Sequence, residues 1–325
     1  MRRSNVFALS LLLLSCYAYA APAELANITD PKLAQYYRSN SDTIDRLGAR
    51  ATNSAAPLNE RLSALQQLQR EFRYAAVPTA AKLIRDPLEP MALAAVSILA
   101  DAVVMSDHPH ATHAKGGKSL VELQHNLARD ALQEALADTR RPVREIAAKT
   151  LASISDEDAL AKINDGAARG LYSDVEAVNY LGLSNPDTSA KYIQPYLDAS
   201  PLAQAAAVTY LGANPTFQAT IRQRYLENVA APEVAKIAAA KTLSRFDTAF
   251  VAYAPNLINA KSLPPEAYKE LVNGYLARTA GRLDAMQLQG IDKALDEYIK
   301  IRPDHDLGGL KDRLKTQMLN KPLGK

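Results

Sequence analysis

The sequence predicts an all-α protein, a right-handed α-solenoid built from stacked pairs of helices. Two observations predict it. A short pattern of small and aliphatic residues returns about every thirty residues, and the composition, with 48% apolar residues and only 13 glycines, favours helix throughout. Repetition at such a period is typical of solenoids, in which each unit buries its apolar face against its neighbours.

The recurrence can be followed by residue number. One small or aliphatic position falls at Leu65, Ala95, Ala148, Ala177, Ala207, Ala240 and Val272, in steps of 30, 53, 29, 30, 33 and 32. Three residues after each comes a large apolar or aromatic residue: Leu68, Ile98, Leu151, Tyr180, Tyr210, Leu243 and Tyr275. This spacing predicts a buried i, i+3 pair on one helix of every unit. The step of 53 indicates an insertion, which we assign to a loop at residues 106–118.

The first twenty residues have the features of a secretory signal peptide. Arg2 and Arg3 form its basic start, residues 6–14 its apolar stretch, and Ala18-Tyr19-Ala20 its cleavage site. The apolar stretch is too short to span a bilayer, so we expect a periplasmic or secreted product. The alternative is a membrane-anchored lipoprotein, because Leu13-Leu14-Ser15-Cys16 resembles the sequence cut before a lipid-modified cysteine.

The rest of the chain divides into three parts. Residues 21–56 are a predicted capping segment, with one helix from about residue 30 to residue 46 and a polar stretch at 49–56. Residues 57–301 form the repeat domain, and residues 302–325 a basic, solvated tail with a partly frayed helix. Helices of the repeat domain are expected at 58–73, 76–85, 89–105, 119–138, 142–154, 157–168, 173–182, 188–198, 201–212, 216–229, 232–245, 248–260, 264–279 and 283–301.

Proline placement supports these helix starts. Pro90, Pro142, Pro201, Pro232 and Pro265 each fall near the first turn of a predicted helix. The missing amide hydrogen of proline costs little there, because the first amides of a helix have no partner within it.

Composition excludes several classes of function. Cys16 is the only cysteine and would leave with the signal peptide, which excludes disulfides and thiol catalysis in the mature chain. Arg2 and Arg3 would leave as well, so the net charge of +3 falls to +1, and no nucleic-acid partner is indicated. The signatures of common hydrolases, metalloproteases and redox enzymes do not occur, so we expect no enzymatic activity.

Two segments resemble HEAT repeats. Residues 80–87 lead to Ala94-Ala95, and Leu136-Ala137-Asp138 leads to Val143-Arg144 and a second alanine pair. They are similar to the HEAT-like repeats of phycobilisome lyases, although the first segment lacks the Val-Arg pair. The resemblance implies a HEAT-like superhelix, a pairing of Arg144 with Asp138, and a scaffold that binds a protein partner. Chromophore handling, as in the lyases, is an alternative that only this subclass suggests.

Four of the five histidines lie close together in the sequence. His108, His110 and His113 are in the inserted loop, and His125 is on the following helix. Imidazole is the commonest metal ligand, so zinc or copper could bind there. The alternative is a solvated polar loop that happens to contain histidines, because His-x-His alone does not define a closed ligand set.

Tyrosines recur in the repeat register. Tyr180, Tyr210 and Tyr275 occupy the same position as leucines in other units, which predicts rings in the core with hydroxyls at its edge. Exposed contact residues are instead expected at Tyr36-Tyr37, Tyr192 and Tyr196. These observations together predict an exported, non-enzymatic scaffold that binds a protein through one row of helices or through the inserted loop. A metal-binding envelope protein is the alternative.

Overall fold

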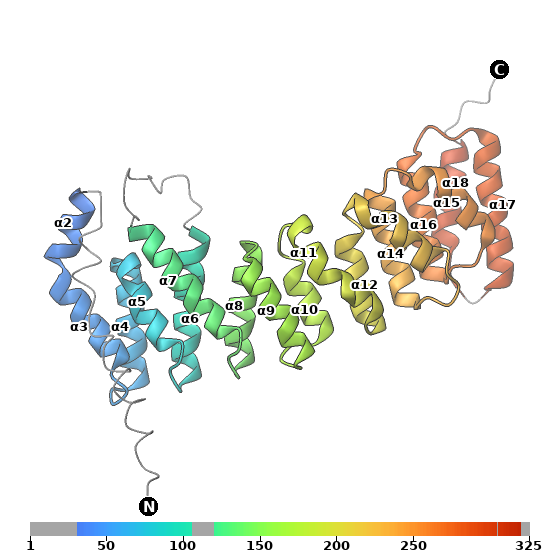
Figure 1. The fold of residues 1–325 in the computed structure, drawn as a ribbon. Coiled ribbons are helices and arrows are strands. Elements are labelled where there is room, and N and C mark those ends of the chain that lie inside the picture. The colour runs from blue at the N-terminus through green and yellow to red at the C-terminus, as the bar shows by residue number, and fades with distance from the viewer. Residues whose placement is uncertain (1–30, 106–119, 304, 320–325) are drawn as a thin grey trace, which may run out of the picture. The chain divides into compact units, whose positions relative to one another are not determined.

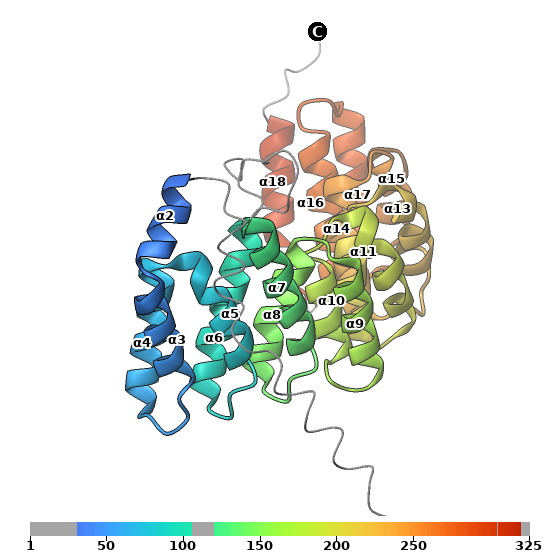
Figure 2. The same ribbon diagram turned by 60° about the vertical axis from the view of Figure 1, so that its left-hand side comes forward.

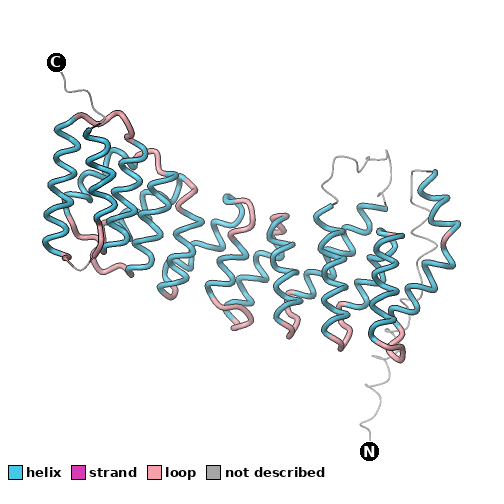
Figure 3. The backbone as a smooth tube through the Cα atoms, turned by 180° about the vertical axis from the view of Figure 1, so that it is seen from behind, coloured by secondary structure: helices cyan, strands magenta, loops and turns pink. Residues whose placement is uncertain are grey.

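The computed structural model describes residues 31–105, 120–303 and 305–319, and all regular structure in these ranges is helical (Figures 1 and 3). The all-α prediction is confirmed for this part of the chain. Contacts divide the chain after Ile154 into two compact units, Met1–Ile154 (unit 1) and Ser155–Lys325 (unit 2). The boundary falls inside the predicted repeat domain, and the repeat register does not mark it.

Unit 1 contains two rows of helices. From α3 onward each helix contacts the next one and the next but one, so that α3, α5 and α7 form one row and α4, α6 and α8 the other (Figure 2). The described helices are α2 (Pro31–Ser39), α3 (Ser41–Thr52), α4 (Leu58–Glu71), α5 (Ala76–Leu83), α6 (Glu89–Met105), α7 (Leu120–Ala135) and α8 (Arg141–Ser153).

Unit 2 contains one continuous row of helices. Helices α10, α12, α14, α16 and α18 contact one another in succession, and we call them the even row. The helices are α9 (Glu157–Ala168), α10 (Asp174–Leu181), α11 (Pro186–Ile193), α12 (Pro201–Leu211), α13 (Pro215–Ile221), α14 (Glu233–Phe246), α15 (Phe250–Ala260), α16 (Pro265–Arg278), α17 (Ala285–Ile301) and α18 (Gly308–Leu319). A 3₁₀ helix, η2 (Gln194–Asp198), follows α11, and a π-helical segment, η3 (Arg222–Leu226), follows α13.

The predicted burial of the recurring positions is confirmed. All seven small or aliphatic positions, from Leu65 to Val272, are fully buried. Their partners three residues later are also buried, except Tyr210, which is half-buried. These positions lie on α4, α6 and α8 of unit 1 and on α10, α12, α14 and α16 of unit 2, so within each unit the thirty-residue period corresponds to every second helix.

The prolines open helices as expected. Pro201 and Pro265 are the first residues of α12 and α16, Pro90 and Pro142 the second residues of α6 and α8, and Pro232 immediately precedes α14. Each helix therefore begins where the absent amide hydrogen removes no helical hydrogen bond.

The capping segment differs from its prediction. One helix was expected to end near residue 46, but Asn40 separates α2 from α3, and α3 continues to Thr52. The side-chain amide of Asn40 donates to the carbonyl of Tyr36 (2.7 Å), which ends the first helix. Leu47 and Ala51 are buried one turn apart, so packing extends α3 into the stretch expected to be polar and non-helical.

Three other segments differ from their predictions. The predicted helices at 188–198 and 216–229 change to η2 and η3 partway along, and the second ends at Leu226. In the predicted tail, Leu310 and Leu314 are buried one turn apart. They pack α18 against α16 and α17, so this part of the tail is an ordered helix.

Candidate binding surface

Glycines bring the helices of the even row close together. A Cβ added at Gly212 would lie 2.7 Å from Cγ2 of Thr242, and one added at Gly274 would lie 2.2 Å from Cβ of Ser244. Such distances are shorter than packed carbons tolerate, so only glycine fits at these crossings. The crossings also determine which turns of α12, α14 and α16 lie side by side.

One outward-facing position recurs along these neighbouring turns. It is occupied by Asn179 on α10, Thr209 on α12, Lys241 on α14 and Asn273 on α16, and we call these four residues the row surface. The first three are exposed and Asn273 is half-buried. The same position on α8 is Lys149, which gives steps of 30, 30, 32 and 32. Relative to this exposed position, the predicted register is one residue early at Ala177 and Ala207, because two adjacent buried residues precede each exposed one.

Hydrogen bonds link the row surface to neighbouring helices. The hydroxyl of Tyr210 donates to Oδ1 of Asn179 (3.4 Å), and Arg313 of α18 donates to Oδ1 of Asn273 (2.6 Å). Both amide oxygens are thus used. The amide nitrogens make no hydrogen bond within the described part of the chain and are available as donors.

Aspartates shape the turns between helices. Oδ1 of Asp86 accepts from the amide of Leu88 (2.9 Å), and Oδ1 of Asp247 accepts from the amide of Ala249 (2.8 Å). An aspartate that bonds the backbone two residues later stabilises a tight turn, which explains why the Asp turn recurs. These carboxylates therefore have a structural role.

The expected contact between Arg144 and Asp138 is present, and a second arginine, Arg140, binds the same aspartate. Arg140 donates to both carboxylate oxygens of Asp138 (2.9 and 2.7 Å), a partner that the family resemblance did not indicate. Arg144 donates to the backbone carbonyls of Asp138 (2.6 Å) and Thr139 (2.9 Å), and its charge also lowers the pKa of the Asp138 carboxyl. Arg144 therefore lies at the expected turn, while Arg140 holds the carboxylate. Hydrogen bonding to Arg140 is the main reason that the pKa of Asp138 is lowered.

This shift predicts a loss of stability in acid. The pKa of Asp138 in the folded chain lies below its unfolded value of about 3.8, so its contribution is present above that pH and is lost as the pH falls through the folded value. We expect Asp138→Asn to destabilise unit 1 by about 1 kcal/mol at neutral pH. Melting curves should show this difference shrinking below pH 3.8. A difference independent of pH would contradict the prediction, and Asp130→Asn, at an exposed aspartate, is the control.

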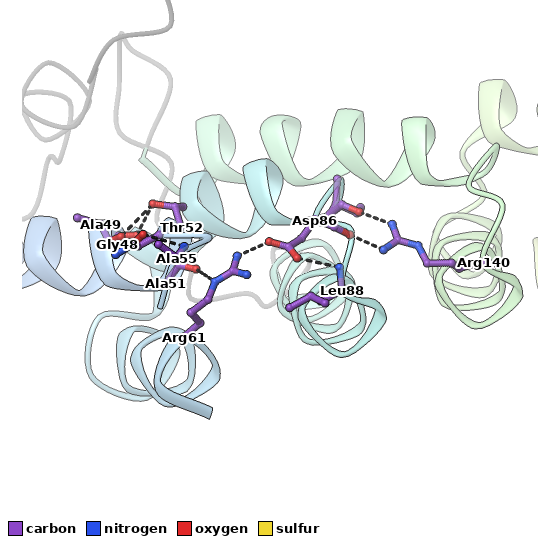
Figure 4. Close-up of polar contacts among 11 residues, drawn as sticks. Gly48, Ala49, Ala51, Thr52, Ala55, Arg61, Asp86, Leu88 and Arg140 are labelled. Atoms are coloured by element: carbon purple, nitrogen blue, oxygen red, sulfur yellow. Dashed lines mark hydrogen bonds and ion pairs between the residues drawn. The ribbon is translucent and has the colours of Figure 1, made fainter. Parts of the chain in front are cut away.

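A chain of charged side chains connects three turns of unit 1 (Figure 4). Arg61 forms a buried ion pair with Asp86, and its Nε donates to the carbonyl of Ala51 (3.0 Å). Arg140 donates to the carbonyls of Asp86 (2.5 Å) and Ile84 (2.9 Å). The side chains of Arg61 and Asp86 are only 2% and 7% exposed. This network joins successive helix pairs and serves the fold.

The tyrosine predictions are confirmed only in part. Tyr180 and Tyr275 are buried as expected, and Tyr210 is half-buried with its ring against Gly182. Among the expected contact residues Tyr36 is 45% exposed and Tyr192 is half-buried.

The prediction is wrong for Tyr37 and Tyr196, which are buried. Burial raises the pKa of each to about 12. The hydroxyl of Tyr196 donates to Oδ1 of Asn164 on α9 (3.0 Å), so this side chain joins neighbouring helices of unit 2 and does not face solvent.

Most of the histidine cluster lies outside the described residues. His108, His110 and His113 lie outside the described residues. So do the predicted signal peptide and Cys16, at which the lipoprotein alternative places a lipid anchor. His125 lies on α7 and is half-buried. Within the described ranges no three His, Cys, Asp or Glu side chains gather as metal ligands would. The predicted zinc or copper site therefore stays a prediction.

None of the described helices is both long and apolar enough to cross a membrane. No family model, no curated protein and no solved structure matches the chain.

The residues of the row surface were not predicted from the sequence. The sequence pattern that could have predicted them occurs in Ala147-Ala148-Lys149-Thr150-Leu151 and Ala239-Ala240-Lys241-Thr242-Leu243. In both, a polar residue follows two small ones at the same position of the repeat.

Proposed function

We propose that this chain is an exported, non-enzymatic scaffold that binds a protein partner through the even row of unit 2. In this proposal its helix pairs form a right-handed, HEAT-like α-solenoid located in the periplasm or outside the cell. A lipid anchor at Cys16 is the alternative form of export.

The row surface is the observation that carries the proposal. It offers amide, hydroxyl and ammonium groups at one register position of four successive helices. The residues four positions further on are Leu183, Ala213, Arg245 and Ala277, and the short side chains of the two alanines let another chain approach closely at α12 and α16. Repeat proteins commonly bind partners along such an extended row of helices.

Capture from envelope extract tests the proposal. The purified chain should retain a specific protein, and Thr209→Trp should reduce the amount retained, because a large ring would stand in the middle of the row surface. Asn256→Trp, at an exposed position of α15, is the matched control and should retain the wild-type amount. Equal retention by both variants, or nothing above background with the wild type, would contradict the proposal.

The alternative is a metal-binding envelope protein, and the clustering of four histidines favours it. Elemental analysis of the purified chain should then give stoichiometric zinc or copper. The His110→Ala and His113→Ala variants should lose most of it, because each removes one ligand. A wild-type chain with substoichiometric metal would rule out this function.

A further inference from the structure

Two cations on the exposed face of α14 have no acidic partner in the part of the chain that the structure describes. Lys241 and Arg245 lie one turn apart, and within the described residues neither forms an ion pair. The guanidinium of Arg245 lies over the ring of Phe246, 5.4 Å from its centroid. Like charges four residues apart disfavour a helix slightly, so this pair is not explained by the stability of α14.

The chain itself provides a comparison. Lys149 occupies the same place in the same five-residue sequence of α8 and pairs with Glu145 at 2.6 Å, one turn earlier. The position equivalent to Glu145 on α14 is Ile237. Lys149 is thus paired with a carboxylate, whereas Lys241 has no ion-pair partner among the described residues.

A third cation continues the row. Arg313 is exposed on α18, and its side chain donates to Asn273 of α16, which lies between it and α14. The acidic residues of α16 do not pair with Lys241 or Arg313 within the described residues. Glu266 lies 4.0 Å from Lys269 of its own helix, and Glu270 forms no ion pair with either cation. Asp312 precedes Arg313 in the sequence but forms no ion pair with it. Lys241, Asn273 and Arg313 therefore present a cation, an amide donor and a cation on successive helices.

We propose that this end of the row binds an acidic peptide segment in extended conformation. The inference rests on the proposed function of the even row and names the class of partner. Packed helices are about 8–10 Å apart, and an extended chain advances about 3.3 Å per residue, so about three residues cross each helix. Acidic side chains about five or six residues apart would reach Lys241 and Arg313. The amide nitrogen of Asn273 would donate to a backbone carbonyl between them.

Selection from random twelve-residue peptides displayed on phage tests this inference on the purified chain. We expect enriched peptides to contain two acidic residues five or six positions apart. Synthetic copies should bind at least tenfold more weakly to Lys241→Glu and to Arg313→Glu, as measured by fluorescence anisotropy. Binding should also weaken as salt is raised, because exposed charges are screened.

The control is Lys149→Glu, which changes a paired lysine at the same register position and should bind within twofold of wild type. Circular dichroism melting would verify that each variant is folded. Peptides without an acidic excess, no enrichment, or equal weakening by Lys149→Glu and Lys241→Glu would overturn the inference. The proposed function is contradicted by a different result, namely that the wild-type chain retains no protein from envelope extract.

Discussion

Replacing Arg61 with methionine is expected to destabilise the α4–α6 region of unit 1 by about 3–5 kcal/mol, since the change leaves the buried carboxylate of Asp86 without its partner. Methionine retains most of the aliphatic volume, so the loss would be mainly electrostatic. Hydrogen exchange at the amides of α4 and α6 is the appropriate measurement, because a repeat chain does not always unfold in one step.

The exposed pair of Arg50 and Glu60 provides the control. Its side chains are 57% and 43% exposed, so Arg50→Met should change stability by less than about 1 kcal/mol. Adding Asp86→Asn to Arg61→Met should recover part of the loss, because asparagine removes the unpaired charge and keeps an acceptor for the amide of Leu88. A loss below about 1 kcal/mol in Arg61→Met would show that the pair contributes little.

The second large effect is expected at Gly274. A Cβ at this position would lie 2.2 Å from Cβ of Ser244 and 2.8 Å from its Oγ, so α14 and α16 would have to separate. We expect Gly274→Ala to destabilise unit 2 by about 1–3 kcal/mol, despite the higher helix propensity of alanine. Hydrogen exchange in α14 and α16 would measure it.

Gly290 on α17 is a matched control, since a Cβ there would have no heavy atom within 4 Å. Gly290→Ala should raise stability by up to about 1 kcal/mol through helix propensity alone. The double variant Ser244→Gly/Gly274→Ala should lose less stability than the sum of the two single variants, because Ser244→Gly removes the atoms in conflict. Equal gains from Gly274→Ala and Gly290→Ala would contradict the close approach of α14 and α16.

The helices and their buried faces were predictable because burial recurs with the repeat. Ala240, Leu243, Ala207 and Leu68 are all buried, as the recurring pattern predicted. A periodic pattern of apolar residues predicts which face of a helix is buried. It cannot distinguish two adjacent buried residues, which explains the one-residue shift at Ala177 and Ala207.

Contacts between distant residues were not predictable in the same way. Arg61 and Asp86 belong to different turns, and a charged side chain is usually expected to be exposed. Tyr196 was expected to be an exposed contact residue within a predicted helix at 188–198. The chain changes to a 3₁₀ helix at Gln194, and three residues per turn instead of 3.6 alter which side chains face inward.

Binding along the even row is most directly tested by photo-crosslinking in cells of the native host. A photoreactive amino acid at position 209 should form a covalent adduct with a specific protein, while the same group at position 256 on α15 should form none. No adduct from position 209, or the same adduct from both positions, would contradict binding at the row surface.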